Sequence, residues 1–61
     1  MVKTSIHAMN NNARVLLRLR LEQQIAWERS QVDYFAALND LPNEQYYMGR
    51  MHALLNLKWE L

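Results

Sequence analysis

A single interruption divides the sequence into two helical segments. Residues 39–44 contain the one proline of the 61-residue chain. Asn39 suits the end of one helix, and Asp40 suits the N-cap of the next. Pro42 fits the first turn of a helix, where its missing N–H costs nothing, and Glu44 would lie near the positive end of that helix. The chain is therefore expected to break here and reverse its direction.

Both segments beside this break have the spacing of amphipathic helices. In the first, one face holds Leu17, Leu21, Ile25, Val32, Phe35 and Leu38. In the second, one face holds Tyr47, Met48, Met51, Leu54, Leu55 and Leu61. This pattern predicts helices over 13–39 and 43–59 with a turn at 40–43. Residues 17–22 also alternate as a half-buried strand does, but Leu, Arg and Glu favour the helix.

We therefore expect an all-α protein, a two-helix antiparallel hairpin over 13–61 preceded by a short N-terminal arm at 1–12. The longer helix would span about 40 Å and the shorter one about 25 Å. The start of the longer helix, 13–19, would then extend past the end of the shorter one. This overhang is apolar on one side, which predicts a contact surface.

The short chain length predicts that the hairpin dimerises into a helical bundle. A domain of this size buries only about 60% of the surface that its unfolded chain exposes. The chain has no cysteine for a disulfide, and we expect no structural metal or cofactor. A hairpin alone cannot cover the second apolar row of its longer helix, which holds Leu16, Trp27, Tyr34 and Leu41, with Gln23 and Ser30 between them.

Three sets of residues are the candidate contacts. The predicted interface consists of Val15, Leu16, Leu19, Trp27 and Tyr34, because Trp and Tyr often anchor such surfaces. The predicted electrostatic contacts are Arg14, Arg18 and Arg20. Gly49 and Ala53 are small and four residues apart, so another helix could pack closely there. A glycine inside a helix costs about 1 kcal/mol relative to alanine, which indicates a packing reason for it.

Charge is unevenly distributed along the chain. Residues 1–20 carry four bases and no acid, whereas 21–61 carry three bases and six acids. The arginines of the first part also face the positive end of their own helix, which favours a bound anion or an acidic protein. Nucleic acid is disfavoured as a partner because the net charge is only +1 and no aromatic residue adjoins the arginines.

The sequence offers no candidate for dedicated chemistry. His7 and His52 are isolated from other metal-ligand residues, so no metal site is expected. The carboxylates Asp33, Asp40 and Glu44 flank a turn, and a hairpin provides no cleft to hold two of them together for catalysis. A non-enzymatic protein is therefore expected. No signal-peptide pattern and no membrane-spanning stretch is found, which predicts a cytoplasmic protein.

The first helix is rich in Arg and Leu, and the second contains the run Tyr46-Tyr47-Met48-Gly49-Arg50-Met51-His52-Ala53-Leu54-Leu55. With the small size, these features over 13–57 resemble the helical accessory proteins of lambda-like bacteriophage early regions. The resemblance implies a regulatory protein in the host cytoplasm that binds a host factor or influences the choice between lysis and lysogeny. It carries over no functional residue. Two alternatives stay open: a minor structural component of an assembly such as a virion, and a dimeric nucleic-acid-binding protein.

Overall fold

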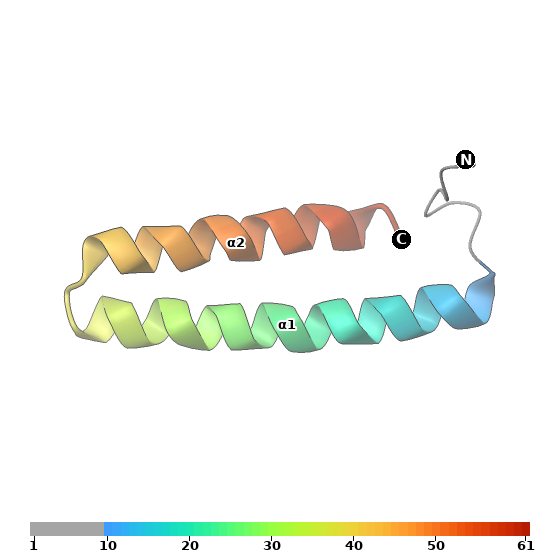
Figure 1. The fold of residues 1–61 in the computed structure, drawn as a ribbon, viewed down its shortest axis with the longest axis horizontal. Coiled ribbons are helices and arrows are strands. Elements are labelled where there is room, and N and C mark those ends of the chain that lie inside the picture. The colour runs from blue at the N-terminus through green and yellow to red at the C-terminus, as the bar shows by residue number, and fades with distance from the viewer. Residues whose placement is uncertain (1–9) are drawn as a thin grey trace, which may run out of the picture.

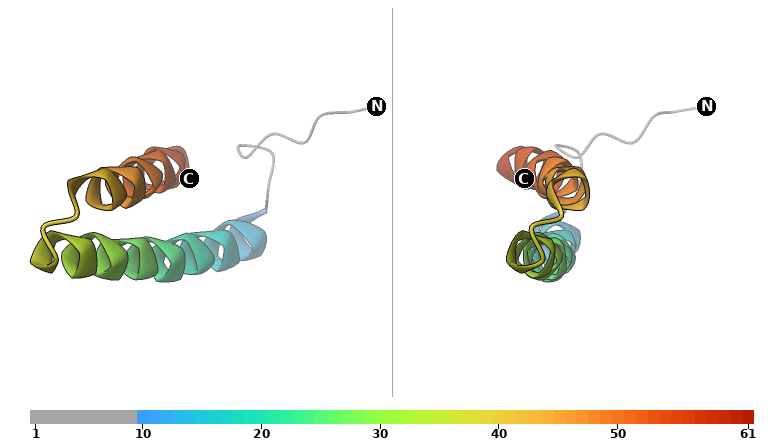
Figure 2. Two further views of the ribbon diagram at one scale, coloured as in Figure 1. Left: turned by 60° about the vertical axis from the view of Figure 1, so that its left-hand side comes forward. Right: turned by 90° about the vertical axis from the view of Figure 1, so that its left-hand side faces the viewer.

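A computed structural model describes residues 10–61 as two antiparallel helices (Figure 1). Helix α1 spans Asn11–Ala37 and helix α2 spans Leu41–Trp59, and no strand occurs in this part of the chain. The predicted all-α hairpin is confirmed. Most of the predicted arm, including His7, lies outside the described residues. Two further views show α2 lying along one side of α1 (Figure 2).

The start of α1 is set by an asparagine cap. The side chain of Asn10 accepts a hydrogen bond of 2.8 Å from the backbone N–H of Ala13. This bond satisfies one of the amide donors that the first turn of a helix leaves without a partner. Because the first of the three consecutive asparagines is the cap, α1 begins at Asn11, two residues before the predicted start.

The turn between the helices is short, and its asparagine has a left-handed backbone. Asn39 has φ 56°, and its N–H donates to the carbonyl of Ala36, while the N–H of Asp40 donates to the carbonyl of Phe35. These two bonds form a Schellman motif, which closes the C-terminus of a helix. Asp40 then caps α2 by accepting a hydrogen bond of 3.4 Å from the backbone of Asn43, and Pro42 lies in the first turn. The predicted roles are confirmed, but the turn occupies residues 38–40.

The helices pack through the predicted faces, and the buried core is small. Among the described residues, Leu21 and Val32 are the only buried apolar side chains. The predicted face of α2 is half-buried, and its Tyr47 ring stacks on Phe35 with the centroids 5.5 Å apart. Leu38, which the pattern placed in the core, is 57% exposed. The reason is that α1 ends at Ala37, so Leu38 belongs to the turn.

The register of the hairpin leaves the first turns of α1 without a helix beside them. Lys58, near the end of α2, forms a salt bridge of 3.0 Å with Glu22, and α1 continues beyond this level toward its N-terminus (Figure 1). The predicted overhang is therefore present, and its Val15 and Leu16 are exposed. Within 10–61, neither helix combines the length and the apolar character that a membrane crossing requires.

The left-handed backbone of Asn39 generates a stability prediction. Asn39→Ala should lower the free energy of unfolding by about 1 kcal/mol, because a Cβ without a polar group disfavours positive φ. Asn39→Gly should leave stability unchanged or raise it slightly, because glycine adopts this conformation freely. Urea unfolding followed by circular dichroism measures both variants. Equal losses for alanine and glycine would show that the side chain, and not the backbone angle, is what matters.

Candidate interaction surface

A row of exposed residues runs along α1 on the side away from the core. Its members are spaced by three or four positions, as on one face of a helix. This outer row of α1 consists of Leu16, Leu19, Gln23, Trp27, Ser30 and Tyr34 within the helix and of Leu38, the residue directly after it. All seven are exposed, and the exposed fractions of the five large apolar ones lie between 48% and 58%. The row therefore presents to solvent the side-chain types that proteins normally cover.

Four of the five predicted interface residues belong to the outer row. Leu16, Leu19, Trp27 and Tyr34 share it, so the structure brings them together along the helix. Val15 is equally exposed. At 3.6 residues per turn it lies about 100° around the helix from Leu16 and so outside the row. The predicted surface is therefore a row with Val15 beside it.

The three predicted electrostatic residues do not form one patch. Arg18 lines a surface groove together with residues from the end of α2, among them Leu55, Trp59 and Leu61. Arg20 is two positions further along α1, and residues two apart point in nearly opposite directions around a helix. The arginines are therefore divided between two sides of α1. This arrangement differs from the continuous basic surface that follows a phosphate backbone.

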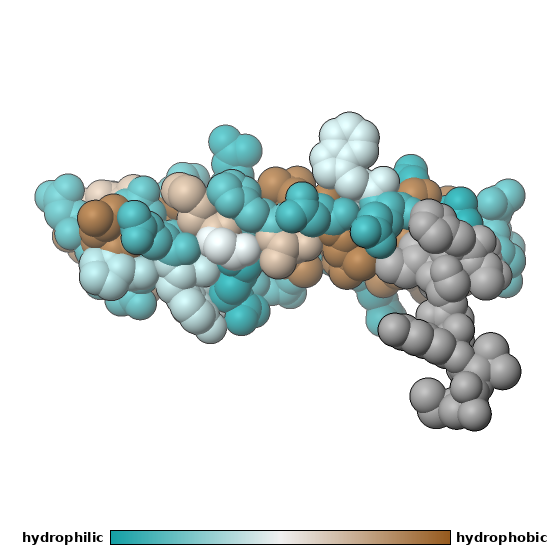
Figure 3. All heavy atoms as spheres, turned by 90° about the horizontal axis from the view of Figure 1, so that it is seen from above, coloured by the Kyte–Doolittle hydropathy of each residue, from teal (hydrophilic) through white to brown (hydrophobic). Residues whose placement is uncertain are grey.

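Gly49 and Ala53 lie on the exposed part of α2. A Cβ placed on Gly49 would meet no atom within 4 Å, so no other segment packs closely against it within this chain. Seen from the side of α2, hydrophobic residues are scattered among polar ones along the whole surface (Figure 3). The predicted close packing at Gly49 would therefore have to involve a helix of another molecule.

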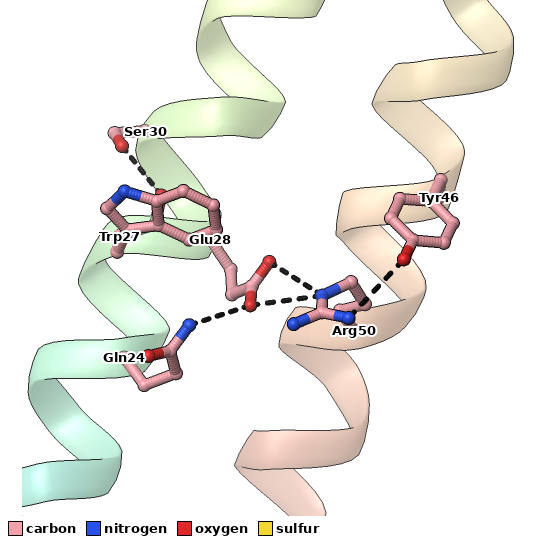
Figure 4. A network of polar contacts seen from close by, with 6 residues as sticks. All are labelled: Gln24, Trp27, Glu28, Ser30, Tyr46 and Arg50. Carbon is pink, nitrogen blue, oxygen red and sulfur yellow. Dashed lines mark hydrogen bonds and ion pairs between the residues drawn. The ribbon is translucent and has the colours of Figure 1, made fainter.

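The most buried side chain is one that the sequence interpretation missed. Glu28 is 0% exposed, and it lies between the helices (Figure 4). Its carboxylate accepts a hydrogen bond of 2.9 Å from Gln24 and bonds of 3.1 Å to both oxygens from Nε of Arg50. The signal was present in the sequence: the predicted core face skips from Ile25 to Val32, and Glu28 occupies the empty position.

Arg50 connects this buried carboxylate to the surface. Its Nη1 donates a hydrogen bond of 3.4 Å to the hydroxyl of Tyr46, and its Cζ lies 5.7 Å from the centre of that ring. The side chain of Arg50 is 48% exposed. The hydrogen bond from Arg50 lowers the pKa of Glu28, outweighing burial, which raises it. Glu28 thus stays ionised at neutral pH, and its two partners, Gln24 and Arg50, hold the carboxylate in one position between the helices.

Comparisons with protein families, curated proteins and solved structures give no match for this chain. Within residues 10–61 there is no group of three or more His, Cys, Asp or Glu side chains that could hold a metal ion. The exposed outer row of α1 and the charges near it are therefore the features of the molecule that can indicate a function.

The buried ion pair generates a pH prediction. Because the folded pKa of Glu28 lies below its ordinary value of 4.5, the pair contributes stability above that value and loses it as the pH falls through the folded pKa. At pH 7, Glu28→Gln should therefore lower the urea midpoint, and its difference from the wild type should shrink as the solution is acidified below pH 4.5.

The matched control is Glu22→Gln, which removes the carboxylate of the exposed Glu22–Lys58 pair. Exposed ion pairs contribute little to stability, so this variant should unfold nearly as the wild type does at pH 7. If the gap between the wild type and Glu28→Gln stayed constant down to pH 3, ionisation of Glu28 would not be its cause.

Proposed function

We propose that this protein is a non-enzymatic interaction protein that works through protein–protein contacts and that associates with a second copy of itself. One observation supports the proposal above the others. Only two apolar side chains are buried in the described part of the chain, whereas ten large hydrophobic residues are exposed. These are Val15, Leu16, Leu19, Trp27, Tyr34, Leu38, Leu41, Tyr46, Leu57 and Trp59.

The physical reason for a partner is the low burial within the hairpin. Burying a large aliphatic or aromatic side chain contributes about 1.5–3 kcal/mol to stability. In this hairpin, the contact between the two helices buries few such side chains. A partner lying on the outer row of α1 would bury several more at once. Trp27 lies in the middle of that row and Tyr34 lies two turns further along it, and these residue types dominate the energetics of many interfaces.

An accessory or regulatory role fits the same features. A small helical scaffold with an exposed apolar row can cover a surface on another protein without any chemistry of its own. In line with the resemblance to phage early-region proteins, we propose a host factor, or a component of the choice between lysis and lysogeny, as its target. The nucleic-acid alternative has less support, because Arg18 and Arg20 lie on different sides of α1.

Self-association is tested by a charged substitution in the outer row. Leu16→Asp would place a carboxylate in the buried contact, where an unpaired charge is strongly unfavourable. It should weaken the dimer by at least tenfold. Asp33→Ala removes a charge outside the row and should change the dissociation constant by less than threefold. Sedimentation equilibrium on both variants and the wild type gives the constants.

Circular dichroism on the same samples distinguishes loss of folding from loss of the interface. Leu16 is exposed in the hairpin, so the variant should keep its helix content while its mass falls toward that of one chain. Equal effects of the two substitutions would place the interface elsewhere. A wild-type chain that sediments as one copy of 7.3 kDa at every concentration would contradict self-association.

A further inference from the structure

We propose that the second copy lies on the outer row of α1 with its own α1 antiparallel, related by a twofold axis that passes beside Ala26 and Trp27. This inference rests on the proposed function and specifies its geometry. Each α2 would then lie on the outside of the assembly, still packed on the opposite side of its own α1. The arrangement follows from the pattern of the row, from the small residues near its middle and from the distribution of charge.

The outer row is nearly symmetric about its own centre. Leu19 and Tyr34 are equally far from a point between Ala26 and Trp27, and Gln23 and Ser30 are equally far from that same point. A twofold interface uses the same patch on both copies, so each residue must suit its mate. Here the apolar Leu19 would meet Tyr34 of the second copy, and polar Gln23 would meet Ser30. The outermost apolar members of the row, Leu16 and Leu38, are centred on Trp27.

The middle of the row permits close contact between two helices. Ala26 beside the axis and Ser30 are small and exposed. The hydroxyl of Ser30 already donates a hydrogen bond of 2.6 Å to the carbonyl of Trp27. It can therefore be covered without losing its donor bond. The amide of Gln23 would need a partner once buried, and a polar residue within an apolar helix contact is a known means of fixing orientation.

The charges select the antiparallel orientation. Residues 11–20 carry three arginines and no acid, whereas residues 33–44 carry three acids and no base. In an antiparallel pair, each basic end lies beside the acidic end of the other copy, whereas a parallel pair would bring like ends together. Of the arginines, Arg20 lies nearest the row, whereas Arg18 lies on the side of α1 that faces α2. The charges therefore act over distances comparable to or longer than the Debye length, which is about 8 Å at physiological salt. At that range the charges affect the relative orientation of the two copies more than the affinity between them.

The overhang of α1 fits the same arrangement. The first turns of α1, which begins at Asn11, extend past the end of α2 (Figure 1). In the antiparallel pair, these turns would lie along Tyr34 and Leu38 of the second copy, at its turn end. The overhanging turns, which have no helix of their own chain beside them, would thereby gain a neighbouring helix on their outer side.

Single-cysteine variants test this geometry, because the natural chain contains no cysteine. Gln23→Cys and Ser30→Cys are made separately, mixed in equal amounts and oxidised mildly at physiological salt. The antiparallel pair predicts at least fivefold more disulfide-linked dimer in the mixture than in either variant alone. A disulfide needs Cα atoms within about 7 Å, and copies of one variant would hold theirs about 10 Å apart along the axis, at 1.5 Å per residue. Asn56→Cys, on the exposed side of α2, measures the rate of random collisions.

The outcomes separate this inference from the proposal on which it rests. Rapid cross-linking of each single variant with itself would mean a parallel pair and would overturn the antiparallel geometry. A dimer by sedimentation that cross-links no faster than the Asn56→Cys control would place the interface elsewhere and would overturn the inference alone. A monomer by sedimentation would overturn both. Preferential linking of Gln23→Cys to Ser30→Cys would support the twofold axis beside Ala26.

Discussion

The contact between α1 and α2 is the constraint on which the rest of the structure depends. Each helix has one neighbour in the described part of the chain, so packing covers one side of it and leaves the others in water. On α1 the uncovered side is not polar: Trp27 and Tyr34 stand there with about half of their surface exposed. The fold thus separates α1 into a side used within the chain and a side available to another molecule.

A polar contact lies in the middle of this small apolar seam. An interface of flexible Leu and Met side chains allows one helix to shift along the other, because many registers bury a similar apolar area. The Glu28–Arg50 and Glu22–Lys58 pairs join the helices at two levels, and a slip by one turn would separate both. Desolvating a carboxylate is costly, but the half-exposed Arg50 keeps its own contact with water. The ion pairs, chiefly the one with the buried Glu28, thereby favour one register and so determine how far α1 extends past α2.

The sequence predicted the features that depend on local chemistry. The roles of Asn39, Asp40 and Pro42 follow from backbone preferences within a few residues, and the facing apolar rows follow from helical periodicity. Helical periodicity also places Glu28 on the core face, but the partner that allows its burial, Arg50, is 22 residues away in sequence and could not be derived from local rules. The division of Arg18 and Arg20 between two sides of α1 was within reach, since it follows from helical geometry alone. The partner that we propose for the outer row could not be identified, because one sequence carries only indirect information about a second molecule.

The central claim is that a second molecule on the apolar side of α1 adds to the stability of the folded hairpin. Its most direct test is urea unfolding of the wild type at protein concentrations across a hundredfold range, followed by tryptophan fluorescence. If folding and dimerisation are linked, the midpoint should rise steadily with concentration, because mass action favours the associated state. A cooperative transition whose midpoint is identical at all concentrations would contradict the claim, since association would then add nothing to the stability of the hairpin.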